Sequence, residues 1–406
     1  MTMNAFEQLR KNGALAGVKV LSLSHVIAGP MAASMLGDFG ADVVHIEQPG
    51  KGDPAREMGD DKDGVYLWWK VAGRNKRSLT LDLKSDKGRE IASRLAQWAD
   101  VVITNMRPSA LERLDLSWEA LHKLNPKLVY LQITGYGRDG PRASDPGFGK
   151  AGEAQSGVVY VTGFPDGPPI HTGFSHADAV TGLMGAYGIL LALYRRNTDP
   201  SFDGELIDLA LYESLFRLIE WQVIGYDQME RVYERSGNRP PMAPAAVVNT
   251  YQSADGDWIT VTSGTTASVS KIVRLLGLPA SEYSTARQQS DAAKFLDASL
   301  RAWVRARNTD DALSELTGGD VVGSRIYNVK DMLNDEVFKW RRSIVSIVDD
   351  ELGPVRMQGV IPQLKNHGGE IWRTGAELGA DNDLILREWL GMTDDDIAAL
   401  REEKVI

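Results

Sequence analysis

The sequence contains no cysteine, and this absence excludes several kinds of chemistry. Without thiols there are no disulfide bonds, no thiolate nucleophile and no thiolate ligands for a metal ion. Histidine is also scarce, and its six positions form no H-E-x-x-H pattern or similar cluster: 25, 45, 122, 171, 176 and 367. We therefore expect no metal centre.

Long apolar runs and an excess of positive charge are missing too. No uninterrupted apolar run reaches the roughly 18 residues that a membrane span needs, and the polar N-terminal stretch MTMNAFEQLRKNGALAG lacks the apolar core of a signal peptide. The 406 residues carry 45 Lys and Arg against 55 Asp and Glu, which gives a net charge of −10. Such a chain has no general attraction for nucleic acid or an anionic membrane, so we expect a cytoplasmic protein with neither partner.

Strand-like and helix-like segments alternate over the first 137 residues. Apolar runs predict strands at 18–24, 42–47, 78–83, 100–105 and 128–137. Helices are expected between them, at 31–41, 85–99 and 117–125, with Ser85 as the N-cap of the second. This alternation predicts a doubly wound α/β domain.

The fingerprint G-x-G-x-x-G of dinucleotide-binding proteins is absent after the first strand. The stretch SHVIAGP at 24–30 contains one glycine, Gly29. An α/β fold without this fingerprint disfavours a nicotinamide-dependent dehydrogenase. His25 nevertheless follows the first strand directly, at the edge where open α/β sheets bind ligands, so it is either a ligand contact or an ordinary turn residue.

A long helix that is apolar nearly all round is predicted at 178–194, and we expect it to be buried. Gly182, Gly185 and Gly188 lie close to one face of it. Because glycine costs helix stability, this stripe indicates close contact with a neighbouring element. A short strand and a second long helix should follow within 205–233.

The chain is too long for one compact core, so we expect two domains. The proposed division is a large domain (1–200 and 330–406), a connecting segment (201–224) and a small domain (225–329). A Pro-rich stretch at 235–246 indicates a linker, and the sequence pattern changes there. After it the pattern predicts hairpins at 247–263 and 345–361, and helices at 268–277, 291–306, 309–317 and 393–403.

The stretch FSHADAVTG at 174–182 holds the three residue types of a hydrolase triad, as Ser175, His176 and Asp178. Neighbouring residues of a helix or strand do not face one another, so a triad within this stretch is disfavoured. Asp178 opens the long helix. There a carboxylate caps the N-terminus or, held ionised by backbone N–H groups, acts as a nucleophile, and the two roles are compatible.

Basic residues gather at two places in this acidic chain. They are Arg74, Lys76, Arg77 and Lys84 within 73–85, and Arg107 and Arg113 after the strand at 100–105. A run of charge is usually a solvated face. The alternative is a local patch that binds the phosphates of an anionic ligand.

The chain resembles the family III CoA-transferases, the group of formyl-CoA transferase and carnitine CoA-transferase. The likeness runs from end to end and is carried by LAGVKVLSLSHVIAGPMAASMLGDFGADVVHIEQPGKGDPAR, NKRSLTLDLKS, LNPKLVYLQITGYGRDGP, AQSGVVYVTGFPDGPP and ADAVTGLMGAYGILLAL. The last segment, LKNHGGEIWRTGAELGADNDLILREWLGMTDDDIAAL, looks most like the carnitine CoA-transferase branch, notably at IWR.

The resemblance implies a discontinuous Rossmann-like large domain, a smaller α+β domain and an interlocked homodimer. It implies transfer of CoA from an acyl-CoA to a free carboxylic acid through an aspartyl anhydride and an aspartyl-CoA thioester. CoA would be a substrate, with no tightly bound cofactor. The catalytic aspartate of the family falls on Asp178, and its CoA contacts fall on His25, Val26, Ala28, Lys76, Arg77, Arg107 and Arg113.

Departures from the family pattern narrow the activity. Gln48 stands where formyl-CoA transferase has an arginine, and SGTT at 263–266 replaces its glycine-rich loop, which argues against formyl or oxalyl specificity. Phe148 occupies the position of the histidine base of α-methylacyl-CoA racemase, which disfavours racemisation. An acyl-CoA racemase or epimerase, and a CoA-binding protein without turnover, are the alternatives.

Overall fold

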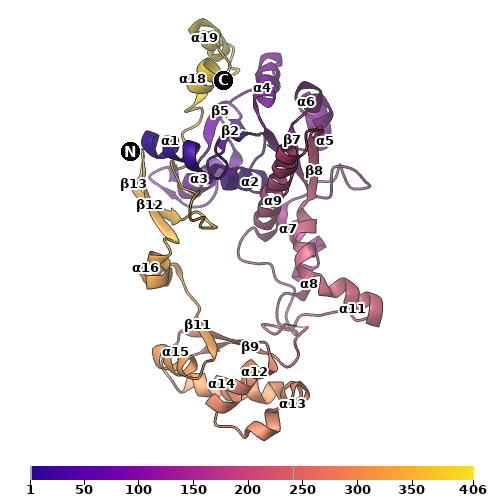
Figure 1. Cartoon of the computed structure of the whole chain (residues 1–406), viewed down its shortest axis with the longest axis vertical. Coiled ribbons are helices and arrows are strands. Elements are labelled where there is room, and N and C mark those ends of the chain that lie inside the picture. Colours follow the sequence, from indigo (N-terminus) through magenta and orange to yellow (C-terminus); the bar gives the residue numbers. More distant parts are fainter. Residues whose placement is uncertain (1, 241) are drawn as a thin grey trace. The chain divides into compact units, whose positions relative to one another are not determined.

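The computed structural model describes residues 2–240 and 242–406, and these form two units. The larger unit combines the chain up to Ser156 with Thr172–Leu218 and Lys339–Ile406, and the smaller unit combines Gly157–His171 with Ile219–Phe338 (Figure 1). Both units are therefore discontinuous in sequence. Residues 157–171, expected in the large domain, belong to the smaller unit. The Pro-rich stretch at 235–246 includes Pro241, which lies outside the described residues.

A six-stranded parallel sheet forms the centre of the larger unit, in the order β5-β2-β1-β6-β7-β8. Its strands are β1 (Lys19–Ser22), β2 (Asp42–Glu47), β5 (Arg77–Thr80), β6 (Val101–Thr104), β7 (Val129–Thr134) and β8 (Glu205–Ala210). The chain starts in the middle and winds outward in both directions, so the strand order reverses between β1 and β6. The carboxyl ends of strands at such a reversal open a crevice for ligands. The expected doubly wound α/β domain is confirmed.

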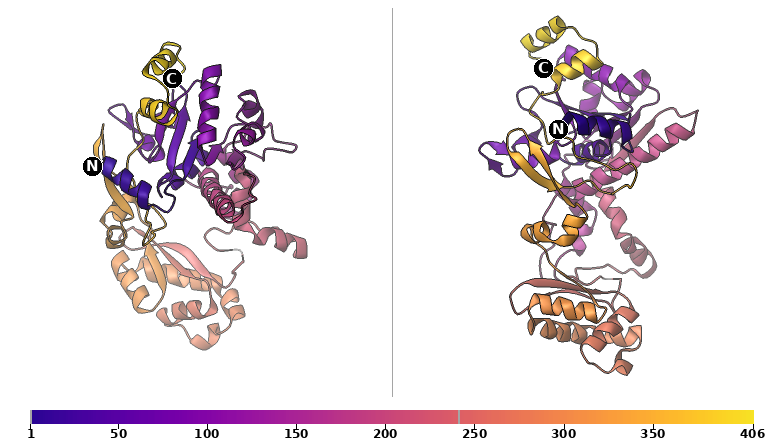
Figure 2. Two further views of the ribbon diagram at one scale, coloured as in Figure 1. Left: turned by 45° about the horizontal axis from the view of Figure 1, so that its top comes forward. Right: turned by 60° about the vertical axis from the view of Figure 1, so that its left-hand side comes forward.

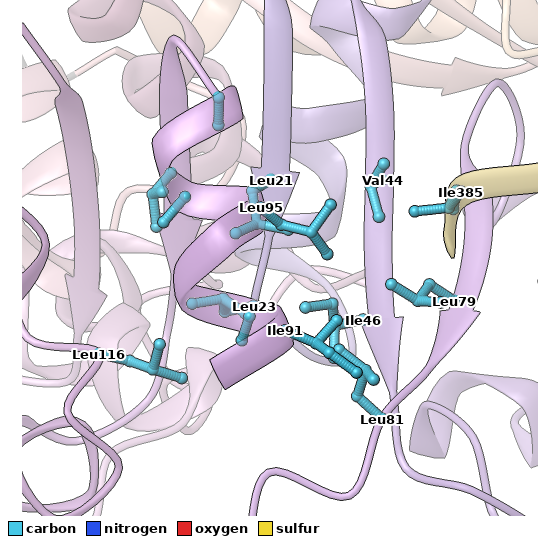
Figure 3. Packing of buried hydrophobic residues seen from close by; sticks show 14 of the residues in the cluster. Leu21, Leu23, Val44, Ile46, Leu79, Leu81, Ile91, Leu95, Leu116 and Ile385 are labelled. Carbon is cyan, nitrogen blue, oxygen red and sulfur yellow. The ribbon is translucent and has the colours of Figure 1, made fainter. Parts of the chain in front are cut away.

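Helices cover both faces of this sheet, because the strands are apolar on both sides. On one face lie α2 (Ala28–Gly37) and α9 (His176–Thr198). On the other lie α4 (Asp86–Trp98) and α6 (Trp118–Leu124). Figure 3 shows side chains of α4 packed among those of the strands, with Ile385 from the C-terminal segment beside them.

The remaining elements of the larger unit are short. Two pairs are antiparallel ribbons, β3–β4 and β12–β13, and the β12–β13 ribbon lies beside α1 in Figures 1 and 2. The bounds are α1 (Thr2–Asn12), η1 (Pro54–Glu57), β3 (Asp61–Lys62), β4 (Val65–Tyr66), α3 (Leu67–Ala72), α5 (Pro108–Arg113), α7 (Gly149–Gln155), α10 (Leu211–Phe216), β12 (Ile344–Asp349), β13 (Gly353–Gln358), α18 (Asn382–Leu384), η4 (Ile385–Trp389) and α19 (Asp394–Glu402).

The smaller unit contains a three-stranded antiparallel sheet in the order β11-β10-β9 and its own apolar core. The hairpin β9–β10 is the one expected at 247–263. The elements are α8 (Val158–Val161), α11 (Trp221–Met229), β9 (Val247–Gln252), β10 (Trp258–Ser263), α12 (Thr266–Leu275), η3 (Ala280–Tyr283), α13 (Ala286–Asp291), α14 (Ala293–Arg305), α15 (Thr309–Gly318), β11 (Val322–Arg325) and α16 (Val329–Asn334). At the unit boundaries lie η2 (Arg217–Ile219) and α17 (Glu336–Trp340).

Several local expectations can be compared with these elements. Ser85 caps α4, and its hydroxyl accepts the Gly88 N–H at 3.0 Å, as predicted. The segment expected as a connection, 201–224, instead supplies the edge strand β8 and α10. The single helix expected after β8 is wrong, because the tight 3-10 turn η2 divides it into α10 and α11.

Helix α9 is confirmed, but the expectation that it is buried all round is wrong. Its glycine face packs on α2 and the sheet, where a Cβ on Gly182 would lie 2.8 Å from the Ala28 carbonyl oxygen. Its opposite face is exposed in the chain and carries Leu183, Tyr187, Leu190, Leu191 and Tyr194. By length and composition α9 alone, among the described helices, could cross a membrane.

The close contact between α2 and α9 requires a residue without a Cβ at position 182, and this requirement can be tested. In an ordinary helix Gly→Ala is stabilising, but here the added Cβ also lies 3.0 Å from Cβ of Met31. We expect Gly182→Ala to lower the free energy of unfolding by about 1–3 kcal/mol, measured by urea denaturation. Gly173→Ala is the control, because its Cβ would meet nothing within 4 Å. Equal stability of the two variants would contradict close packing.

Candidate active site

A cavity of about 1110 Å³ opens at the carboxyl ends of β1, β6 and β7. It lies at the reversal of strand order where doubly wound sheets bind ligands, and it is large enough for a sizeable organic molecule. Its wall is formed by His25, Val26, Ile27, Ala28, Gln48, Gly50, Lys51, Gly52, Asp53, Pro54, Glu57, Met58, Asn105, Ile133, Thr134, Gly135, Gly147, Phe148, Gly149, Lys150, Ser175, Asp178 and Leu211.

The loop after β1 is held to the loop after β6 by one side chain. The Asn105 amide accepts the His25 N–H at 2.8 Å and donates to the His25 carbonyl at 2.7 Å. These two bonds fix the backbone on both sides of the crevice. Burial, reinforced by the nearby His45, lowers the pKa of His25. The imidazole of His25 in the cavity wall is therefore neutral at neutral pH.

The next residue, Val26, has a φ of 66°, a left-handed conformation that costs a β-branched residue conformational energy. Both carboxylate oxygens of Asp53 accept its N–H, at 3.0 and 3.1 Å. Burial opposes ionisation of Asp53, but the hydrogen bonds from His45, Ala55 and Val26 outweigh it and lower its pKa to about 2. An ionised carboxylate thus holds the strained turn at the mouth of α2.

A buried Ser–His–Asp chain extends from this carboxylate. His45 Nε2 lies 3.2 Å from Asp53 Oδ2, and His45 Nδ1 lies 3.0 Å from the Ser22 hydroxyl. The three side chains are those of a hydrolase triad, but each is at most 1% exposed. No substrate reaches the serine. These three hydrogen-bonded side chains therefore order the β1–α2 turn and are not a site of acyl transfer.

Asp178 lies in the first turn of α9 and lines the cavity. Its carboxylate is packed so closely on α7 that a Cβ on Gly149 would overlap Oδ2. Burial and then the neighbouring charge of Glu153 raise the pKa of Asp178 to about 6, against weaker opposing effects of the backbone and Lys150. At neutral pH it is an ionised, partly desolvated carboxylate facing a cavity, which suits a nucleophile.

The local triad disfavoured from the sequence is not formed in the structure. Ser175 and Asp178 line the cavity, whereas His176 does not. The His176 ring packs against Phe174 at 5.2 Å between centroids, and its buried Nδ1 has no hydrogen-bond partner among the residues that the structure describes. Asp178 is thus the one residue of FSHADAVTG with both a charge and access to the cavity.

The expected CoA contacts divide into two groups. His25, Val26 and Ala28 line the cavity. Lys76 and Arg77 are buried elsewhere: Arg77 begins the edge strand β5, and Lys76 directly precedes it. The Lys76 ammonium donates to the Ala72 carbonyl at 2.6 Å, and Arg77 Nε donates to Asp42 at 3.0 Å. Burial lowers the pKa of Lys76 to about 8.

The remaining predicted cations, Arg107 and Arg113, are exposed at the two ends of α5 and do not line the cavity. Sequence reasoning missed the two lysines that do line it with exposed side chains, Lys150 in α7 and Lys51 in the turn after β2. The position of Lys51 after a strand, between Gly50 and Gly52, was the available signal. Within residues 2–240 and 242–406 no three His, Asp or Glu side chains are grouped as metal ligands.

Comparisons with known proteins show the family to which this chain belongs. A family model described as CoA-transferase family III matches residues 15–382. Succinyl-CoA–D-citramalate CoA-transferase of Chloroflexus aurantiacus is 37% identical over 398 residues, which covers 97% of this chain and 98% of that protein. The beta subunit of succinyl-CoA–L-malate CoA-transferase from the same organism is 34% identical, with coverage of 97% and 98%.

A solved structure supports the fold independently of these sequence matches. The crystal structure of a CAIB/BAIF family protein from Brucella suis superimposes with a TM-score of 0.81 at 29% identity, and the match covers 93% of this chain and 99% of that one. The parallel six-stranded sheet with small antiparallel sheets is therefore an architecture already observed in that family.

The raised pKa of Asp178 has a measurable consequence for stability. Between its ordinary value of 3.8 and about 6, the folded chain binds a proton that the unfolded chain has released, so stability from this group falls as pH rises. We expect Asp178→Asn to stabilise the protein by on the order of 1–3 kcal/mol at pH 8, with a gain that shrinks toward pH 4. Urea denaturation at both pH values measures it.

The control for this prediction is Asp60→Asn, which removes an exposed carboxylate. It should change stability little at either pH. A stabilisation by Asp178→Asn that is the same at pH 4 and pH 8, or a loss at pH 8, would contradict a desolvated carboxylate at position 178.

Proposed function

The chain belongs to CoA-transferase family III and transfers CoA between an acyl-CoA and a carboxylic acid. From this premise we propose that Asp178 carries CoA covalently between the two substrates. The observation that supports this is the carboxylate of Asp178, desolvated against Gly149 and open to a cavity at the crevice of the sheet. A carboxylate with a pKa of about 6 is ionised at neutral pH and more basic than an ordinary aspartate.

The proposed reaction proceeds through covalent intermediates on Asp178. Its carboxylate attacks the donor thioester carbonyl, the C–S bond breaks, and a mixed anhydride and CoA thiolate form. The thiolate then attacks the aspartyl carbonyl, which releases the donor acid and leaves an aspartyl-CoA thioester. The acceptor carboxylate repeats these two steps in reverse, forming the new acyl-CoA and freeing Asp178. Each intermediate retains the thioester energy, so one difficult exchange becomes several easier ones.

We place the acyl-CoA thioester over the turn formed by His25, Val26 and Ala28. These residues and Asp178 line the same cavity, and the turn is fixed by Asn105 and Asp53 before any ligand arrives. The cavity wall carries two exposed lysines, Lys51 and Lys150. Because Lys150 is paired with Glu153, we assign to Lys51 the attraction of the anionic groups of the ligand. Pre-organised backbone lowers the entropy lost on binding.

For the acids we propose short dicarboxylic acids, with succinyl-CoA as donor. The two relatives reported above are named for succinyl-CoA with citramalate or malate, both hydroxylated dicarboxylic acids. The carnitine branch favoured by the IWR stretch would need a site for a quaternary ammonium group, which aromatic faces bind best. Phe148 is the one Phe, Tyr or Trp among the described residues of the cavity wall.

The homodimer and the cytoplasmic location also remain proposals. The exposed apolar face of α9 supports a homodimer, because a contiguous apolar patch of this kind commonly marks a protein interface. A racemase is not supported, since Phe148 lines the cavity in place of a histidine and cannot exchange a proton.

The proposed function predicts the outcome of a transfer assay. Protein incubated with succinyl-CoA and a panel of acids should form citramalyl-CoA or malyl-CoA faster than carnitinyl-CoA, formyl-CoA or oxalyl-CoA, as measured by chromatography of the CoA esters. Asp178→Ala should slow transfer by at least roughly 1000-fold, because the nucleophile is lost. Undiminished transfer by Asp178→Ala would remove the covalent role, and a preference for carnitine would overturn the substrate class.

A further inference from the structure

Helix α7 carries a buried carboxylate that the reaction above does not use. The Glu153 side chain is 2% exposed, and the ammonium of Lys150, one turn earlier, contacts both of its oxygens at 3.0 Å. A buried carboxylate is costly unless it is paired and hydrogen-bonded. The Glu153–Lys150 pair is therefore well ordered, and its hydrogen bonds show which segment it positions.

The pair is bonded to the segment that leads into α9. Glu153 Oε1 accepts the N–H of His176, the first residue of that helix, at 3.1 Å. The Lys150 ammonium donates to the carbonyls of Thr172 and Phe174 at 3.0 and 2.9 Å. Two side chains of one helix thus fix the start of another. Asp178 lies two residues beyond His176, within the same turn.

We propose that Glu153, balanced by Lys150, is a positioning residue for the nucleophilic step, which sets the orientation and the electrostatic surroundings of the Asp178 carboxylate. This inference rests on the proposed function, in which Asp178 is the nucleophile. Glu153 itself touches no substrate, since it is buried behind the cavity wall and does not line it.

Other titratable groups lie on the elements packed against α9, and none of them is among the charges that shift the pKa of Asp178. Helix α2 carries no titratable side chain. Tyr130 of β7 donates to the Leu116 carbonyl, Asp208 of β8 accepts the Arg138 N–H, and Glu213 of α10 accepts the Ala210 N–H. Tyr212 on α10 and Glu205 on β8 complete the set. The charges that act on Asp178 are those of Glu153, which raises its pKa, and Lys150, which lowers it.

The two charges therefore have opposite and separable effects. The negative charge of Glu153 keeps Asp178 more basic than an exposed aspartate, and therefore a better nucleophile. The positive charge of Lys150 limits the rise, so that Asp178 stays ionised at neutral pH. A pair that only held the backbone, without acting on the charge of Asp178, would leave the titration of Asp178 unchanged.

The test is the pH dependence of kcat/KM for succinyl-CoA, whose acidic limb reports the ionisation of Asp178 in the free enzyme. Glu153→Gln keeps an oxygen that accepts the His176 N–H but removes the charge. Its acidic limb should move to lower pH by roughly 0.5–1 unit. Lys150→Gln should move the limb to higher pH by a similar amount, and Lys150→Arg should restore the wild-type position. Glu90→Gln, an exposed carboxylate on α4, is the control and should leave the limb in place.

The outcomes separate this inference from the proposed function. Opposite shifts in the Glu153 and Lys150 variants support a positioning role. Limbs that coincide with the wild-type limb, or that move in the same direction, overturn it even when Asp178→Ala is inactive. Full activity of Asp178→Ala would instead overturn the nucleophile. If Glu153→Gln does not fold, Lys150→Gln and Lys150→Arg decide the question, because a limb unmoved in both contradicts the role.

Discussion

The close packing of the Asp178 carboxylate on Gly149 is the constraint on which the active site depends. Any side chain at position 149 would occupy the space of the carboxylate, so glycine is required there by contact and not by backbone conformation. The contact removes water from one side of Asp178 and leaves the other side open to the cavity. Desolvation and access, which usually oppose each other, are combined at one group.

The rest of the larger unit supplies the fixed surroundings that this carboxylate needs. The reversal of strand order between β1 and β6 places the turn at His25–Ala28 opposite the first turn of α9. Asn105 and Asp53 hold that turn by hydrogen bonds to its backbone. The hydrogen-bonded side chains of Asp53, His45 and Ser22 are buried beneath it. The scaffold therefore holds the ligand-binding backbone in place through buried polar groups, each of them hydrogen-bonded.

Much of this architecture could be predicted from the sequence. Continuous apolar runs predicted the parallel strands, and Ser85 predicted a helix start. The position of Asp178 at the head of a glycine-striped helix left a cap and a nucleophile open, and the family resemblance made it the candidate nucleophile. Local patterns sufficed because each feature depends on residues near in sequence. The fold class and the CoA-transferase family follow from the same stretches.

What could not be predicted depends on contacts between distant residues. Asn105 lies 80 positions from the His25 backbone that it holds, and nothing in its own neighbourhood marks it. Lys76 and Arg77 belong to a basic cluster in sequence, yet both are buried. Arg77 in the edge strand β5 donates to Asp42, which is distant in sequence, and Lys76 donates to the Ala72 carbonyl. Charge alone does not tell whether a side chain faces a cavity or a neighbouring carboxylate.

The central claim is that Asp178 carries CoA covalently, and peptide mass measurement after incubation with succinyl-CoA alone tests it most directly. The account predicts that the peptide containing Asp178 gains the mass of CoA less one water, and that hydroxylamine releases the CoA and leaves the hydroxamate of Asp178, whereas Asp178→Asn never shows the CoA adduct. An enzyme that turns over while the Asp178 peptide stays unmodified, with the adduct on another residue, would contradict the account.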